Sequence, residues 1–197
     1  MKGKKLAQLI GSLCLVCALV LAAFLVLNQR EDNSIFSKDT KPNTEVQSIL
    51  AKDIDRNYPA TQREVVRLFA RSSRWYHNET ISEEEFQGLV EMQRKLFDEE
   101  FLENNPLDTF TNNLAAEIDS AKAKKYQMTT WRVQKQSSVV TWQDGDNHFS
   151  SIIASFIMNE KTVGYTRTYE QFLLREDESG RWKIVGWRLT DPVEIEE

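Results

Sequence analysis

Two histidines, His77 and His148, are the side chains of this 197-residue chain best suited to acid–base chemistry near neutral pH. His77 ends a helical pattern, where an imidazole also satisfies the last backbone carbonyls and suits the negative end of the helix dipole. His148 follows a turn and starts a strand pattern, so we expect it to be solvated. No H-E-x-x-H motif, glycine-rich phosphate loop or nucleophile elbow accompanies them. The sequence therefore predicts no catalytic residue, no metal site and no cofactor.

Three short motifs have ordinary structural explanations. The run Asp144-Gly145-Asp146-Asn147 offers oxygen ligands that suit calcium but lacks EF-hand spacing, so we predict a hairpin turn. Cys14 and Cys17 have C-x-x-C spacing within an apolar run, where packing explains them better than redox chemistry. The acidic run Asp98-Glu99-Glu100 is expected to face solvent, and the alternative is a docking surface for a basic partner.

Aromatic side chains are the remaining candidates for a binding site. Apolar clefts with a few polar groups bind small molecules, although aromatics on amphipathic elements often belong to the core instead. The candidate pocket residues are Trp75, Tyr76, His77, Trp131, Phe156, Tyr165 and Trp187.

Hydrophobic periodicity predicts helices in the first half of the chain and strands in the second. Two capping-box motifs, beginning at Thr61 and Ser82, start amphipathic helices, and the second helix is expected to continue through Leu102. A third helix follows Pro106. Four extended segments rich in β-branched and aromatic residues then alternate with turns. The predicted segments are helices at 61–76, 83–102 and 106–125, and strands at 126–143 (bent at 135–137), 148–158, 162–175 and 181–189. Helices followed by a meander of antiparallel strands predict an α+β fold of about three helices on one face of a curved four-to-five-stranded sheet.

An uncharged hydrophobic run, Leu6–Leu27, precedes this domain. About 20 apolar residues span a bilayer, whereas the apolar region of a cleaved signal peptide has about 7–15. The small pair Ala22-Ala23 lies inside the run, so no clean cleavage site follows it. Lys2, Lys4 and Lys5 stand before the run, and the positive-inside rule then places the N-terminus in the cytoplasm. We expect a single-pass protein of the cell membrane with an extracytoplasmic C-terminal domain.

The net charge of −5 bears on the partners of that domain. Nucleic-acid and anionic-lipid binding rest largely on basic patches. An acidic chain therefore predicts no nucleic-acid partner and disfavours an anionic lipid surface.

Three stretches carry a resemblance to a known superfamily. They are Tyr58-Pro59, the run Leu96–Leu102, and the closing strand Gly180–Trp187, which reads G-R-W-K-I-V-G-W. With helices first and long strands last, the chain resembles the NTF2-like (cystatin-like cone) superfamily. More narrowly, it resembles uncharacterised membrane-anchored NTF2-like proteins of Gram-positive bacteria. The resemblance implies a sheet that curls around the helices and leaves a pocket at its open end, but no enzyme motif of the superfamily matches this sequence.

Two hypotheses for function follow. The first is a non-enzymatic module that binds a protein or ligand, for example within a cell-envelope complex. The second is a small-molecule enzyme of the isomerase or hydratase type, or a ligand binder, that uses the cone pocket; Glu117, Asp119, His77 and Tyr165 would then be the groups to examine. The predicted organisation is a cytoplasmic stub at 1–5, a transmembrane helix at 6–27, a tether at 28–57, the NTF2-like domain at 58–191 and an acidic tail at 192–197.

Overall fold

The computed structural model describes residues 44–78 and 80–195. The predicted cytoplasmic stub, the predicted transmembrane helix and residues 28–43 of the predicted tether lie outside these residues. Within the described ranges, no helix has the length and apolar character needed to cross a membrane.

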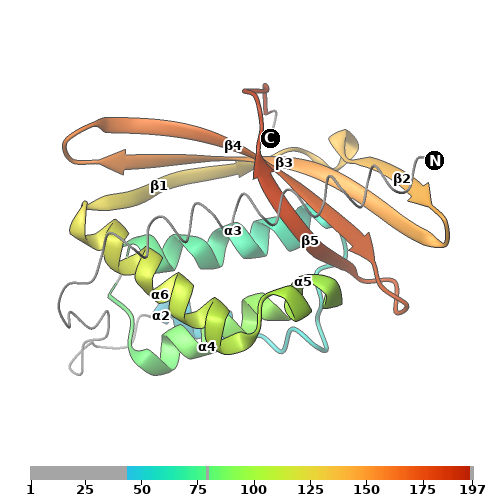
Figure 1. Ribbon diagram of the computed structural model, residues 1–197, viewed down its shortest axis with the longest axis horizontal. Helices are drawn as coiled ribbons and strands as arrows, with labels where there is room; N and C mark the ends of the chain where they lie inside the picture. Colours follow the sequence, from blue (N-terminus) through green and yellow to red (C-terminus); the bar gives the residue numbers. More distant parts are fainter. Residues whose placement is uncertain (1–43, 79, 196–197) are drawn as a thin grey trace. The chain divides into compact units, whose positions relative to one another are not determined.

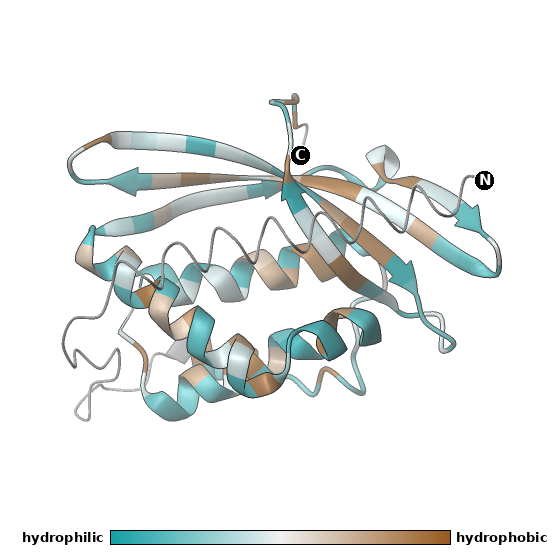
Figure 2. Cartoon of the chain, viewed as in Figure 1, coloured by the Kyte–Doolittle hydropathy of each residue, from teal (hydrophilic) through white to brown (hydrophobic). Residues whose placement is uncertain are grey.

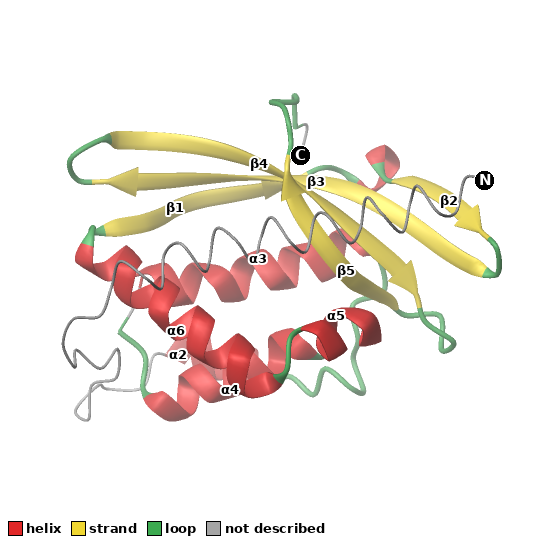
Figure 3. Ribbon diagram, in the orientation of Figure 1, coloured by secondary structure: helices red, strands yellow, loops and turns green. Residues whose placement is uncertain are grey.

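The described chain forms five helices, one short 3-10 turn and five strands, with all α-helices before all strands (Figures 1 and 3). The helices lie on one face of the antiparallel sheet, so the predicted α+β class is confirmed. The helices are α2 (Thr44–Leu50), α3 (Gln62–Asn78), α4 (Glu83–Arg94), α5 (Glu99–Asn104) and α6 (Leu107–Ala123). The strands are β1 (Tyr126–Val133), β2 (Val140–Asp144), β3 (Asn147–Glu160), β4 (Gly164–Glu176) and β5 (Trp182–Leu189), and the 3-10 turn η1 is Gln136–Ser138.

The sheet has the order β1-β3-β4-β5, and β2 also pairs with β3. β1 pairs with the second half of β3 and β2 with the first half, so the two form one edge strand interrupted by η1. At the interruption, the Gln134 N–H donates to the Ile153 carbonyl at 3.0 Å, and the Ile153 N–H donates to Gln134 Oε1 at 3.0 Å. The predicted bend at 135–137 is therefore a local break in pairing.

The predicted capping box at Ser82 is complete, whereas at Thr61 only the hydroxyl contact forms as predicted and the Glu64 carboxylate binds the Ala60 N–H instead of the Thr61 N–H. The Ser82 hydroxyl accepts from the Glu85 N–H at 3.2 Å while the Glu85 carboxylate accepts from the Ser82 N–H at 3.0 Å, which is a capping box. At α3 the Thr61 hydroxyl accepts from the Glu64 N–H at 3.2 Å, and Glu64 Oε2 accepts from the Ala60 N–H at 2.9 Å. Side chains thus satisfy backbone donors that the first turn of each helix leaves open.

The second helix does not run through Leu102 as predicted. It stops at Arg94, and the chain then extends so that Phe97 pairs in parallel with Ile184 at the outer edge of β5. The Ile184 N–H donates to the Leu96 carbonyl at 2.8 Å, and the Asp98 N–H donates to the Ile184 carbonyl at 2.9 Å. Tertiary pairing with β5 therefore overrides local helix propensity.

Asp98 corrects the prediction that the acidic run faces solvent. It is buried, it caps α5 through the Glu100 N–H at 3.0 Å, and it forms an ion pair with Arg175 in which Nε lies 3.0 Å from Oδ2. Glu99 and Glu100 are exposed, as expected for the first turn of a helix.

The hydrophobic core lies between the helices and the sheet, and Figure 2 shows apolar residues concentrated on the strands and on the helices below them. The largest fully buried apolar and aromatic side chains come from both layers: Val46, Ile49, Tyr76, Phe86, Leu89, Leu96, Ile118, Ile152, Phe172, Leu174 and Ile184. This packing fixes the ends of α3 and α6 against β1, which is where the site described below lies.

Candidate functional site

The structure separates the seven predicted pocket residues into distinct environments. Trp75, Tyr76 and Phe156 are buried in the core, whereas Tyr165 is 72% exposed on β4. Trp131 is half-buried on β1, with the Arg67 guanidinium 5.9 Å from its ring centroid. The other two are Trp187, which joins an aromatic cluster, and His77, which lines a cleft.

The aromatic cluster occupies the space between α3, α5 and strands β4 and β5. Trp187 lies 5.0 Å from Phe69, 5.6 Å from Phe101 and 5.8 Å from Phe172, measured between ring centroids. Phe69 and Phe172 are themselves in an edge-to-face contact at 5.5 Å. The contacts of Trp187 with Phe101 and Phe172 are stacked and its contact with Phe69 is tilted. Aromatic contacts with these geometries stabilise a packed core. Phe and Trp rings therefore fill this part of the domain.

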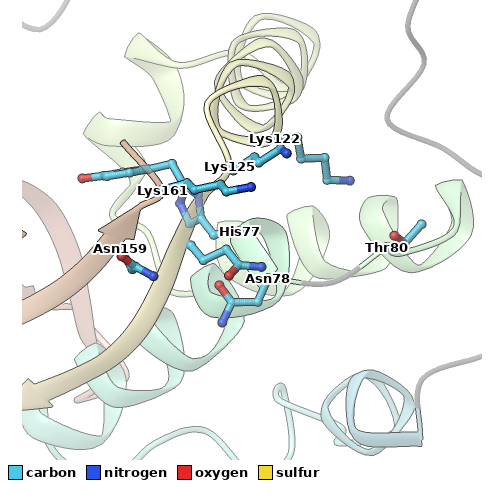
Figure 4. Close-up of a pocket in the computed structure, with 9 residues that line it drawn as sticks. His77, Asn78, Thr80, Lys122, Lys125, Asn159 and Lys161 are labelled. Carbon is cyan, nitrogen blue, oxygen red and sulfur yellow. The ribbon is translucent and has the colours of Figure 1, made fainter. Parts of the chain in front are cut away.

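A cleft of about 420 Å³ lies at the end of the domain where α6 leads into β1 (Figures 1 and 4). Its lining is polar and basic, unlike the aromatic cluster. Four segments contribute to it: the end of α3, the end of α6, the start of β1 and the β3–β4 hairpin. The lining residues are His77, Asn78, Thr80, Lys122, Lys125, Tyr126, Gln127, Asn159 and Lys161.

Backbone geometry brings these segments together. Asn78 ends α3, and its side-chain amide forms two hydrogen bonds with the backbone of Met128 in β1. Nδ2 donates to the Met128 carbonyl at 2.7 Å, and Oδ1 accepts from the Met128 N–H at 2.8 Å. Lys125 follows α6 with φ of 53°, a left-handed conformation that turns the chain directly into β1. Gln127 of β1 pairs with Asn159 of β3, just before the hairpin that carries Lys161. Residues far apart in the sequence thus meet at one end of the sheet.

Three lysine ammonium groups give the cleft its charge. Figure 4 shows Lys122, Lys125 and Lys161 gathered beside His77. Among the described residues, none of the three lysines forms an ion pair with a carboxylate. Burial lowers the pKa of Lys122, and the nearby Asp119 carboxylate opposes part of that shift. Two of the lysines also suit the negative end of the α6 dipole, but Lys161 comes from a hairpin and has no such role.

His77 is the most enclosed titratable group of the cleft. Burial lowers the pKa of its imidazole, which favours the neutral form. Its Nδ1 is buried and has no hydrogen-bond partner within the described part of the chain. A neighbouring anion would favour the protonated ring, which would then donate a hydrogen bond. The arrangement is chemically suited to hold a carboxylate or phosphate group.

A pair of carboxylates outside the cleft also has shifted pKa values. Burial raises the pKa of Glu170 to about 7, and the charge of Glu117 adds to the shift. Burial also raises the pKa of Glu117 and of Asp119, two of the groups proposed from sequence. Sequence reasoning missed Glu170, although strand alternation places it on the same side of β4 as Phe172 and Leu174, both buried.

His148 neither lines the cleft nor belongs to the aromatic cluster. It is exposed at the start of β3, as expected, and its Nδ1 lies 2.9 Å from Glu176 Oε2 on β4. The predicted turn before it is present, because Asp144 pairs with Asn147 around Gly145, whose φ is 61°.

Comparison with known proteins places the chain in a family without assigning a function. No curated protein sequence matches it. Among solved structures it is similar to the intermembrane space region of the chloroplast protein ARC6, with 14% sequence identity over 75% of this chain and 98% of that chain and a TM-score of 0.31. A family model matches residues 1–187, and the chain therefore belongs to the family described as Domain of unknown function (DUF6715).

Proposed function

We propose that the protein is a membrane-anchored, extracytoplasmic module of NTF2-like fold that binds an anionic group in the basic cleft and catalyses no reaction. The observation that carries this proposal is the convergence of Lys122, Lys125 and Lys161 on a cleft that also contains His77. None of these lysines forms an ion pair with a carboxylate in the part of the chain that the structure describes. The ligand is a carboxylate- or phosphate-bearing molecule, or such a group on a protein of the cell envelope.

Size and polarity support a small charged ligand. Ligand sites typically have volumes of roughly 300–1,000 Å³, and the cleft falls within that range at about 420 Å³. Hydrogen bonds from ammonium groups to anions are about twice as strong as neutral ones. Gln127, Asn159 and Thr80 add neutral polar groups that can orient the ligand. The ammonium groups would therefore attract an anion, and the neutral polar groups would orient it.

The fold supports the NTF2-like part of the proposal. Helices precede an antiparallel sheet, and the closing Trp182–Leu189 strand contributes Trp187 to the contact between sheet and helices. The hydrophobic run Leu6–Leu27 supports the membrane anchor. In this domain the aromatic cluster occupies part of the space between sheet and helices, where an enzyme of the superfamily would hold its substrate.

A second candidate function rests on Glu170 and Glu117. A carboxylic acid with pKa of about 7 is well matched to general acid–base catalysis near neutral pH. Neither carboxylate lines the basic cleft, so an enzyme would need a separate substrate site beside them. The binding function is favoured because its charged groups and its cleft coincide.

Direct binding tests the first candidate. Full-length protein in nanodiscs of neutral lipid would be titrated with inorganic pyrophosphate and, separately, citrate by isothermal calorimetry. Replacing Lys161 by Gln should weaken binding by about three- to tenfold, because a charge-assisted contact at a partly exposed site contributes roughly 0.5–1.5 kcal/mol. Lys52→Gln is the matched control, since Lys52 is exposed and does not line the cleft. Equal affinities for the two variants, or no binding by the wild type, would remove the basis for the proposal.

A further inference from the structure

We propose that the anion held by the cleft is the phosphate of an anionic membrane lipid, and that the β3–β4 hairpin rests on the bilayer surface beside it. This inference builds on the proposed function, because it names the source of the anion. It would also give the domain a fixed orientation toward the membrane to which its predicted anchor attaches.

The first observation is an exposed apolar and aromatic hairpin. Val163 is 71% exposed and Tyr165 is 72% exposed, and they flank Gly164, whose φ of 92° makes the tight turn possible. Two such side chains at the tip of a hairpin add nothing to the core. Aromatic and apolar residues with this placement are enriched where proteins meet the interfacial region of a bilayer.

The second observation is that the hairpin and the cleft are continuous. Lys161 belongs to the hairpin turn and also lines the cleft, and Tyr165 pairs directly with Asn159, another lining residue. Lys122 and Lys125 reach the same place from the end of α6, which lies at the same end of the domain as the hairpin (Figure 1). The apolar tip of the β3–β4 hairpin and the lysine-lined cleft therefore form one continuous surface.

Charge and topology favour a lipid over a dissolved ion. A dissolved anion would use the lysines but would leave Val163 and Tyr165 in water. A lipid supplies both a phosphate for the lysines and an interfacial layer for the two side chains. The predicted anchor would attach the domain to the same membrane, so this second contact is effectively intramolecular.

Nearby carboxylates limit the strength of the contact. Glu160 begins the hairpin turn and accepts a hydrogen bond from the Thr162 hydroxyl at 3.1 Å, and Asp119 lies close enough to influence the pKa of Lys122. Glu170 likewise influences the pKa of Tyr126, a lining residue. Among the described residues, these carboxylates lie around the cleft and none of them lines it. We therefore expect a reversible contact that requires anionic lipid and weakens as salt screens it.

The test places an environment-sensitive fluorophore on the hairpin of the full-length protein. Cys14 and Cys17 are replaced by Ala, Val163→Cys carries the dye, and the protein is reconstituted in nanodiscs of phosphatidylcholine alone or mixed with phosphatidylglycerol. In the mixed discs the emission should shift to the blue and be quenched by lipid-attached quenchers. Glu178→Cys is the matched control, because Glu178 is exposed in the turn at the other end of β4 and its dye should remain in water.

Replacing the cleft lysines links the hairpin contact to the site. Each of Lys122→Gln and Lys161→Gln should reduce the ratio of lipid-contacting to free hairpin about fivefold, equal to the roughly 1 kcal/mol that a lysine contributes near an anionic surface. Intrinsic tryptophan fluorescence confirms that each variant is folded. The proposal is overturned if the dye at position 163 behaves identically in the two lipid compositions, or if the lysine variants leave its contact unchanged.

The outcomes separate this inference from the function on which it rests. Pyrophosphate binding in neutral nanodiscs together with a water-exposed hairpin in anionic nanodiscs would retain the binding function and reject the lipid. Loss of both pyrophosphate binding and hairpin contact would reject both the binding function and the lipid proposal. A hairpin that is shielded equally in neutral and anionic discs would reject the requirement for an anionic lipid and point to a protein or apolar contact instead.

Discussion

Glu170 provides the sharpest test of the electrostatics of the sheet. It lies within β4 between Ala154 of β3 and Leu189 of β5, on the face that carries buried Phe172 two residues further on. Burial and the neighbouring Glu117 charge raise the pKa of Glu170 from 4.5 to about 7. Replacing Glu170 by Gln keeps the size of the side chain and removes its ionisation.

The sign of the effect follows from proton linkage. The folded state holds its proton on Glu170 up to a pH of about 7, whereas the unfolded chain releases it near 4.5, so folding is favoured by low pH. This contribution is fully present below pH 4.5 and is lost as the pH rises through 7. A shift of this size corresponds to roughly 3 kcal/mol at 1.36 kcal/mol per pKa unit, and partial solvent access reduces it to about 2 kcal/mol.

Urea unfolding of the full-length protein in non-ionic detergent, followed by tryptophan fluorescence, measures the effect. The free energy of unfolding of Glu170→Gln should match that of wild type near pH 4.5 and exceed it by about 2 kcal/mol at pH 8. Glu103→Gln on α5 is the matched control, since Glu103 is exposed, and its profile should follow wild type throughout. If the free energies of unfolding of wild type and Glu170→Gln changed in parallel with pH, burial would not raise the pKa of Glu170 as described.

Three further substitutions test how the site and the core are held, each by the same urea unfolding measurement. Asn78→Ala removes both hydrogen bonds to the Met128 backbone and should cost about 1–3 kcal/mol and perturb the cleft; an unchanged midpoint would mean that β1 does not need this support. Ser82→Ala breaks the capping box with Glu85 and should cost about 1 kcal/mol, whereas a loss well above 2 kcal/mol would indicate a role beyond the cap. Phe172→Ala opens the aromatic cluster at a fully buried position and should cost about 3–5 kcal/mol, so a loss under 1 kcal/mol would contradict the packing described.

The sequence predicted those parts of the fold that depend on local signals. Capping motifs at Thr61 and Ser82 predicted the starts of α3 and α4, and the Asp144–Asn147 run predicted the β2–β3 turn. Each of these motifs covers three or four residues and depends on hydrogen bonds between a side chain and a nearby backbone group. Runs of β-branched and aromatic residues likewise predicted where β3, β4 and β5 lie, with ends that differ by one or two residues, whereas the first predicted strand is divided into β1 and β2 by η1.

The break between α4 and α5 had no comparable local signal. Leu96, Phe97 and Phe101 continue a helical pattern of apolar residues, and a helix would have placed all three on one face. The chain extends at Leu96–Asp98 because Ile184, far away in sequence, offers backbone groups at the edge of β5. A pairing of this kind depends on where β5 lies after folding, so periodicity within the segment could not reveal it.

The candidate site shows a similar limit. Aromatic residues were singled out because they suit pockets, yet the side chains that distinguish the cleft are Lys122, Lys125 and Lys161. A lysine near a helix end is ordinary in a sequence, since it complements the dipole wherever the helix lies. Lys122 and Lys125 indicate an anion site only once folding brings Lys161, from the β3–β4 hairpin, beside them.

Net charge is a weak guide to the partners of a single site, for a physical reason. A chain with net charge −5 suggests repulsion from anionic surfaces, but charges beyond a Debye length of about 8 Å are largely screened at physiological ionic strength. Binding at a cleft therefore responds to the charges around it, here three lysines with Asp119 and Glu160 nearby, and hardly to acidic residues elsewhere. The dominant acidity of the chain is compatible with a basic site, and it would confine anion binding to the one end of the domain where the lysines meet.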